Sequence, residues 1–205
     1  MKLIFATGNR GKLREAQEIL GPDYELVTPA SLGITEDIEE TGETLEENSL
    51  IKARYLYERT GLDCFADDTG LEVDALGGAP GVHTARYASE VALRDGLPVP
   101  PSHDFEANIT TLLRELGSRP GEARTARFRS VVTLITGGGV HTFEGVLEGS
   151  IATEKAGCGG FGYDPVFIAD EYPDRTVAEI SEEAKNAISH RGKALRAMAE
   201  WLRQR

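Results

Sequence analysis

Residues 1–20 have the sequence MKLIFATGNRGKLREAQEIL, in which an apolar run, a polar turn and a helical pattern follow one another. The apolar run at residues 3–6 predicts a short buried strand. Beyond the turn, apolar residues recur at the spacing of one helix face: Leu13, Ala16, Ile19 and Leu20. Gly21-Pro22 predicts where this helix ends. A strand that leads through a glycine-containing turn into a helix is typical of α/β proteins.

The rest of the chain continues this mixture of strand and helix signals. Thr44-x-x-Glu47 has the form of a capping box, which predicts a helix from there to residue 60. Three prolines between residues 96 and 104 predict a loop before a helix at about 105–117. The apolar stripe of a last helix, up to Leu202, indicates core or subunit packing. Further strands are predicted at 24–27, 63–66, 71–73, 127–136, 140–147 and 166–168, the pair at 127–147 as a hairpin. We expect an α/β fold with a partly antiparallel sheet and no strong domain boundary.

Length and charge exclude several classes of protein. The 205 residues suffice for one domain with a sizeable core, or for two lobes that share a cleft. The net charge of −12 argues against sequence-independent nucleic-acid binding, although a few local cations can still hold a small anion. Cys64 and Cys158 are too few for a disulfide scaffold. With neither a signal peptide nor 18 consecutive apolar residues in the sequence, we expect a soluble, cytoplasmic protein without a membrane partner.

The turn after the first strand is a candidate phosphate site, formed by Thr7, Gly8, Asn9, Arg10, Gly11 and Lys12. Backbone N–H groups at a helix start favour anions, and the two basic side chains add positive charge. The segment is not a Walker A loop, which would need glycine in place of Ala6 and serine or threonine in place of Leu13. An ordinary turn capped by Asn9 or Thr7 is the alternative.

Two acidic segments are candidates for a metal site. Residues 36–47 hold seven carboxylates, most of them expected on a solvated surface, and Glu40 precedes the helix that carries Lys52. Asp67 and Asp68 stand at the end of a predicted strand, where neighbouring side chains point to opposite faces. One of the two could bind Mg²⁺ or take a proton from water, while the other holds the backbone or a cation. An Asx turn that closes a hairpin is the alternative.

Two later segments could contact a planar or anionic ligand. Residues 157–165, GCGGFGYDP, combine glycines that allow close backbone approach with side chains that we expect to be exposed: Phe161, Tyr163 and Asp164. A wide turn into the next strand is the alternative. Residues 185–192, KNAISHRG, place three cationic or titratable side chains within seven positions, which favours an anion or carbonyl site.

In their order and spacing, these five segments resemble the inosine triphosphate pyrophosphatase family, hydrolases of the non-standard purine nucleotides dITP, ITP and XTP. The resemblance extends from residues 6–9 to residues 189–192 and is especially clear at 48–54, 66–87 and 159–165. It implies an α/β fold with an elongated mixed sheet flanked by helices, in a single domain of residues 1–205 with two lobes around a central cleft. It also implies a magnesium-dependent, homodimeric enzyme that cleanses the nucleotide pool by releasing monophosphate and pyrophosphate.

The resemblance further implies roles for individual residues. Asp68 would accept the proton of the attacking water, and Glu40 and Asp68 would bind the magnesium. Substrate would be bound by Thr7, Gly8, Asn9, Arg10, Gly11, Lys12, Thr69, Phe161, Gly162, Tyr163, Asp164, Lys185, His190 and Arg191. The first six would cradle the triphosphate, and the members from Phe161 onward would form the base pocket.

Two positions depart from the family pattern without touching the expected chemistry: Thr69, where serine is common, and Cys158, where a small hydroxyl residue is frequent. Lys185 and Arg191 are donors only, so they would donate to the C6 oxygen of hypoxanthine or xanthine and would leave the adenine amino group unpaired. One alternative is a regulator that binds purine nucleotides without hydrolysis, which the acids Glu40 and Asp68 disfavour. Another is a pyrophosphatase for other modified nucleotides.

Overall fold

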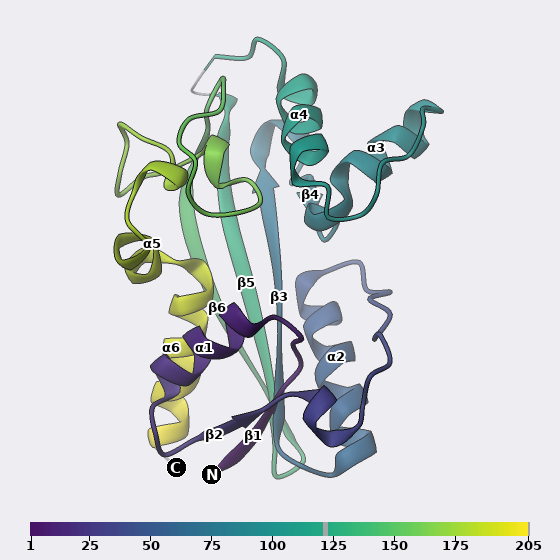
Figure 1. Cartoon of the computed structure of the whole chain (residues 1–205), viewed down its shortest axis with the longest axis vertical. Helices are drawn as coiled ribbons and strands as arrows, with labels where there is room; N and C mark the ends of the chain where they lie inside the picture. Colours follow the sequence, from purple (N-terminus) through teal and green to yellow (C-terminus); the bar gives the residue numbers. More distant parts are fainter. Residues whose placement is uncertain (121–122, 205) are drawn as a thin grey trace. The chain divides into compact units, whose positions relative to one another are not determined.

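The structure of the chain, a computed structural model, describes residues 1–120 and 123–204 (Figure 1). The strands are β1 (Lys2–Phe5), β2 (Glu25–Val27), β3 (Cys64–Val73), β4 (Pro80–Gly81), β5 (Thr125–Thr136), β6 (Gly139–Ile151) and β7 (Phe167–Ala169). The α-helices are α1 (Arg10–Leu20), α2 (Leu45–Thr60), α3 (Tyr87–Asp95), α4 (Phe105–Leu116), α5 (Glu182–Ile188) and α6 (His190–Arg203). None of the described helices is both long and apolar enough to cross a membrane.

The strands form one mixed sheet in the order β2-β1-β3-β5-β6-β7, with β4 paired to β3. β1 runs parallel to both of its neighbours, so that Ile4 lies opposite Val27 of β2 and Cys64 of β3. Parallel neighbours need long crossover connections, which here contain α1 and α2. The pairs β3–β4 and β6–β7 are antiparallel. The expected α/β class with a partly antiparallel sheet is therefore confirmed.

The chain divides into two compact units. Unit 1 comprises Met1–Thr69, Ser130–Val146 and His190–Arg205, and unit 2 comprises Gly70–Arg129 and Leu147–Ser189. The three longest strands, β3, β5 and β6, each contribute residues to both units.

In unit 1, alternate residues of each strand face different helices. Leu3 and Phe5 of β1 are buried in a cluster with α1 and α6, whereas Ile4 is buried in a second cluster with α2. The alternation continues in β3, where Phe65 belongs to the first cluster and Ala66 to the second. Figure 1 shows α1 and α6 on one side of these strands and α2 on the other. Because side chains on a strand point alternately to opposite faces, each residue of β3 is directed toward one helix layer or the other.

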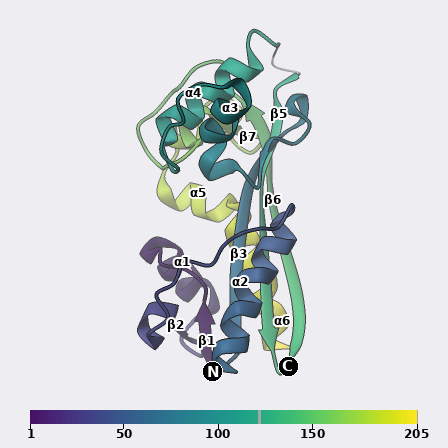
Figure 2. The ribbon, with the colours of Figure 1, turned by 90° about the vertical axis from the view of Figure 1, so that its right-hand side faces the viewer.

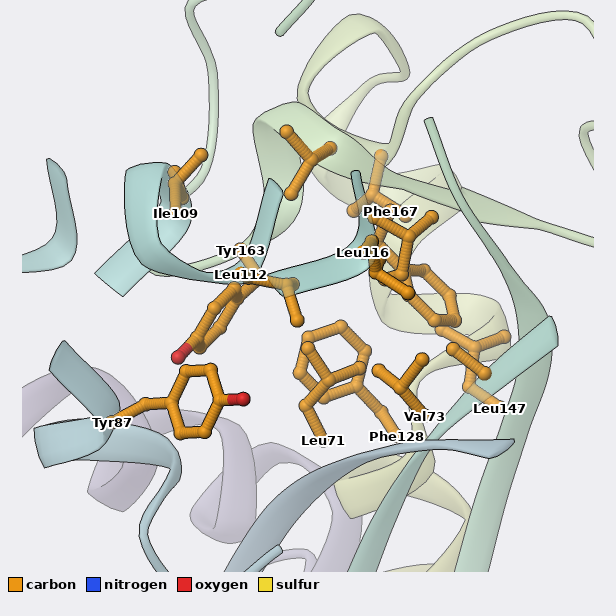
Figure 3. Close-up of a cluster of buried hydrophobic side chains, with 14 of the residues drawn as sticks. Leu71, Val73, Tyr87, Ile109, Leu112, Leu116, Phe128, Leu147, Tyr163 and Phe167 are labelled. Atoms are coloured by element: carbon orange, nitrogen blue, oxygen red, sulfur yellow. The ribbon is translucent and has the colours of Figure 1, made fainter. Parts of the chain in front are cut away.

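In unit 2, α3 and α4 lie side by side (Figure 2), and the unit also contains the ends of β3 and β6 and the beginning of β5. Figure 3 shows the core beneath them, which includes Leu71, Val73, Tyr87, Ile109, Leu112, Leu116, Phe128, Leu147, Tyr163 and Phe167. The buried Arg124 donates from its guanidinium to the carbonyl oxygens of Gly117, Ile151 and Ala152 at 3.2, 2.7 and 2.7 Å. These bonds fasten the C-terminal end of α4 to the end of β6.

The structure corrects one prediction about the strands and adds two helices. The segments predicted as separate strands at 63–66 and 71–73 form the single strand β3. The polar residues 67–70 between these two segments indicated a turn. In the structure, cations from the helices pair with the carboxylates of Asp67 and Asp68, so the strand continues through them. The hairpin of β5 and β6 is confirmed and is longer than expected, and α3 and α5 were not predicted.

The predicted start of α2 is confirmed, with a different second bond in its cap. Thr44 Oγ1 accepts the N–H of Glu47 at 3.1 Å, as a capping box requires. The Glu47 carboxylate, however, accepts the N–H of Glu43 at 2.7 Å.

Candidate active site

The turn between β1 and α1 is folded around Asn9. The Asn9 side-chain oxygen accepts hydrogen bonds from the N–H groups of Gly11 at 2.8 Å and Lys12 at 3.2 Å, and the Asn9 N–H donates to Thr7 Oγ1 at 3.1 Å. Asn9 is thus the helix cap, as one interpretation of this segment held. Residues 8–11 are exposed, and the first turn of α1 carries basic rather than acidic side chains. The positive end of the helix therefore remains open to an anion.

Asp67 and Asp68 lie inside β3 and not at the end of a strand, which corrects the sequence-based placement. Because side chains alternate along a strand, Asp67 shares the face of Phe65, toward α1 and α6. Asp68 shares the face of Ala66, toward α2. The expectation that the two carboxylates point to opposite faces is confirmed by their different partners.

Asp67 is paired with two cations. Its Oδ1 and Oδ2 accept hydrogen bonds from Lys12 Nζ at 3.1 and 2.9 Å, and Oδ2 also accepts from Arg191 Nε at 3.0 Å. The Asp67 side chain is only 1% exposed. Burial opposes its ionisation, but the ammonium of Lys12 and the guanidinium of Arg191 outweigh burial and hold the pKa of Asp67 well below its usual range.

Asp68 and Glu40 meet at a single ammonium group. Lys52 Nζ, supplied by α2, donates to Glu40 Oε1 at 2.6 Å and to Asp68 Oδ1 at 3.0 Å. Burial raises the pKa of Asp68, and the charges of Glu40 and Asp67 add to the rise, whereas Lys52 offsets part of it. Burial lowers the pKa of Lys52, but the surrounding carboxylates outweigh burial and leave that pKa above its ordinary value. A buried carboxyl with a raised pKa is a better proton acceptor than one with a strongly lowered pKa.

Glu40 reaches this position because the preceding loop is fastened to α2. The N–H of Gly42 donates to Oδ1 of the buried Asn48 at 2.8 Å. A Cβ atom at residue 42 would lie 2.7 Å from that oxygen, so the close approach requires glycine. Asn48 and Lys52 stand one turn apart on α2, so one helix face holds both the loop and the two carboxylates.

The carboxylates of Glu40 and Asp68 fit a magnesium ion. Mg²⁺ in proteins takes one or two carboxylates and completes its octahedron with waters and substrate phosphates. The two carboxylates converge on the same positive group, which is the arrangement that such an ion needs. Within residues 1–120 and 123–204, no three or more His, Cys, Asp or Glu residues gather as a complete metal site. The remaining ligands of a magnesium ion here would be phosphate and water oxygens.

Thr69 follows Asp68 in β3 and faces β5. Its hydroxyl donates to Ser130 Oγ at 3.0 Å, and Ser130 is fully buried. This bond fixes the orientation of the Thr69 side chain, which shares the face of Asp67 in β3.

In unit 2, the glycine-rich segment forms a turn closed by Asp164. The Asp164 carboxylate accepts the N–H of Phe161 at 2.8 Å and the Lys185 ammonium at 2.5 Å. Gly160 has a φ of +72°, and a Cβ there would collide with the Asp164 carboxylate, so the turn requires glycine. Phe161 is 58% exposed, and Lys185 Nζ lies 4.9 Å from its ring centroid. An exposed aromatic face and an ammonium therefore lie together.

The expectation that Phe161, Tyr163 and Asp164 are all exposed is correct only for Phe161. Tyr163 is buried in the core of unit 2 (Figure 3). Its hydroxyl donates to the Thr84 carbonyl oxygen at 3.0 Å. Asp164 is buried beneath its own turn. Tyr163 thus contributes packing, and Gly162, with a φ of +63°, lets the backbone turn between the two aromatic residues.

The residues expected in one base pocket belong to different units. Phe161, Tyr163, Asp164 and Lys185 are in unit 2, whereas His190 and Arg191 begin α6 in unit 1. Arg191, expected to contact the base, pairs with Asp67 and donates from Nη1 to Glu15 Oε2 at 3.3 Å. Sequence reasoning missed Glu15. Its position one turn after Lys12 on the same helix face was the available signal.

Both the sequence and the fold of this chain are closely similar to those of known proteins. The model of the Ham1 family matches residues 3–201. A protein of Porphyromonas gingivalis named dITP/XTP pyrophosphatase is 50% identical over 201 residues, which cover 98% of this chain and 97% of that protein. A protein of the same name from Christiangramia forsetii is 45% identical, with 98% and 99% covered. The solved structure of a HAM1 protein from Coxiella burnetii has a TM-score of 0.88 at 37% identity, with 100% of both chains covered.

Proposed function

Because the chain belongs to the Ham1 family, we propose that it hydrolyses the non-standard purine nucleotides dITP, ITP, XTP and dXTP to monophosphate and pyrophosphate and so cleanses the nucleotide pool. The observation that best supports this proposal is that the carboxylates of Glu40 and Asp68 both pair with the ammonium of Lys52. A regulator that only binds nucleotides is not favoured, because the relatives that are 45–50% identical to this chain are named dITP/XTP pyrophosphatase.

The triphosphate is bound in this proposal by the turn from Thr7 to Lys12. The open helix N-terminus and the basic side chains Arg10 and Lys12 attract its negative charge. Mg²⁺ held by Glu40 and Asp68 supplies further neutralisation of charge on the phosphate oxygens.

Asp68 accepts the proton of the attacking water. The water oxygen forms a bond to the α-phosphorus, the bond to the α–β bridging oxygen breaks, and pyrophosphate leaves with that oxygen. Lys52 remains hydrogen-bonded to Asp68 and keeps this carboxylate oriented. Thr69, fixed by Ser130, contacts the substrate beside it.

The purine stacks on the exposed ring of Phe161, next to Gly162 and to the Asp164–Lys185 pair of the same unit. Stacking on Phe161 adds affinity for any purine. The Lys185 ammonium, which is a donor only, favours an oxygen at C6. The proposal includes a homodimer in the cytoplasm without a nucleic-acid or membrane partner, which rests on the family resemblance and the net charge of −12.

The test is the release of pyrophosphate from ITP, dITP, XTP, GTP and ATP with Mg²⁺. We expect kcat/KM for ITP to exceed that for ATP by up to about 10⁴-fold, because unpaired polar groups in the pocket reject adenine. Asp68→Asn keeps the shape of the side chain and should lower kcat by about 10²–10⁴-fold. A chelator should abolish turnover. Equal kcat/KM for ATP and ITP, or full activity of Asp68→Asn, would contradict the proposal.

A further inference from the structure

Asp67 joins three segments of unit 1 that are far apart in the sequence. It lies in β3 and binds Lys12 from the start of α1 and Arg191 from the start of α6. Lys12 Nζ and Arg191 Nε lie 2.9 and 3.0 Å from the same oxygen, Oδ2. One carboxylate therefore sets the positions of two cations relative to each other.

The surroundings of Asp67 exclude it as the base that takes a proton from the attacking water. Both of its oxygens accept hydrogen bonds from cations, and 1% of its side chain is exposed. Asp68, with 13% of its side chain exposed, lies on the opposite face of the strand. A candidate base must reach the proton that it abstracts, which Asp67 cannot do from beneath two side chains.

We propose that Asp67 is a positioning residue that holds Lys12 for the triphosphate and Arg191 for the substrate. This inference rests on the proposed function. An ammonium has three donors, of which two are directed at Asp67, so the third points away from it toward a ligand. Arg191 is likewise held through Nε and Nη1, which fixes the plane of its guanidinium. A misplacement of a substrate-binding cation by about 1 Å can lower the rate about 10²-fold. Holding Lys12 and Arg191 in place can therefore offset the cost of burying the Asp67 carboxylate.

A double-mutant cycle between Asp67 and Lys12 tests this role. Asp67→Asn keeps nearly the same side-chain shape but removes the negative charge. The amide NH2 group is itself a donor, so it can be directed at one of the two cations in place of an acceptor oxygen. We expect kcat for ITP to fall about 10²-fold in the otherwise unchanged protein. In the Lys12→Ala background the same change should cost less than about tenfold, because only the effect through Arg191 remains.

An equal loss in both backgrounds, or no loss in either, would overturn the proposal. Circular dichroism before each assay gives the folded fraction, so that rates refer to folded protein. If Asp67→Asn does not fold, Asp67→Glu, which keeps the charge on a longer arm, replaces it in the same cycle with the same two criteria.

A second readout separates this proposal from the proposed function. If the unaltered protein hydrolyses none of the nucleotides, the proposed function fails, and the cycle is measured on the affinity for tripolyphosphate without metal by calorimetry. The positioning role then predicts that Asp67→Asn alone raises Kd at least about tenfold and that the same change in the Lys12→Ala background raises Kd less than about twofold. Equal changes in Kd would refute it.

Discussion

Replacing Lys52 by methionine keeps the length of the side chain and removes the ammonium that lies between Glu40 and Asp68. In the unaltered protein that group is 2.6 Å from one carboxylate and 3.0 Å from the other. Without it, two carboxylates remain close together in a site where the Asp68 side chain is 13% exposed. We therefore expect Lys52→Met to destabilise the protein when no divalent cation is present.

The magnitude follows from the burial of the three side chains. Removing one partner of a buried ion pair costs about 3–5 kcal/mol. The Glu40 side chain is 33% exposed, so water screens part of the repulsion and the lower end, about 3 kcal/mol, applies here. For a chain of this length, that corresponds to a fall in Tm of roughly 6–12 °C.

Magnesium should reverse this loss. A bound cation replaces the missing positive charge, and at 100 times Kd binding adds about 2.7 kcal/mol to the free energy of unfolding. In the unaltered protein the added stability should be smaller, because the Lys52 ammonium already neutralises part of the negative charge of the two carboxylates and repels a bound cation.

The assay is thermal unfolding followed by circular dichroism, in chelator and in excess Mg²⁺. Lys155→Met is the matched control, because Lys155 pairs with Glu106 on an exposed surface, where a salt bridge contributes about 0–1 kcal/mol. If Lys52→Met and Lys155→Met shift Tm equally in chelator, or if Mg²⁺ stabilises Lys52→Met no more than the unaltered protein, the electrostatic account of this site is refuted.

Three further predictions concern the rest of the chain. A thiol-reactive disulfide should modify the exposed Cys158 in the folded protein, and Cys64 only after unfolding. Burial shields the Cys64 thiol and raises its pKa to about 12. Modification of both thiols in the folded protein at neutral pH would contradict this burial. Since the pKa of the Cys64 thiol is higher in the folded protein than its ordinary 9.0, the free energy of unfolding should also fall as pH rises through that interval. Gly149→Ala should destabilise the chain by about 1–3 kcal/mol, because the new methyl group would collide with the Ile168 carbonyl at the β6–β7 pair. Gly8→Ala, where a Cβ meets nothing within 4 Å, is its control in a urea titration, and equal midpoints for the two variants would refute the steric argument.

Local patterns in the sequence were sufficient for most of the fold. The apolar run at 3–6, the spacing of Leu13 to Leu20 and the cap at Thr44 each depend on near neighbours, and the structure confirms the elements that they predict. The failure at residues 67–70 has a physical cause. Two adjacent carboxylates are typical of a turn unless something neutralises them, and the neutralising cations come from segments distant in the chain.

The candidate site shows the same division. The chemistry of its residues, a glycine-containing turn with basic side chains and pairs of carboxylates, was available from composition and spacing alone. The separation of Asp67 from Asp68 into different environments was not, because it depends on which helix covers each face of β3. Lys12 and Arg191 reach Asp67 only after α1 and α6 pack on one face, and Lys52 reaches Asp68 only after α2 packs on the other. The alternation of a strand is a local property, but the charges that meet each of its faces are set by tertiary packing.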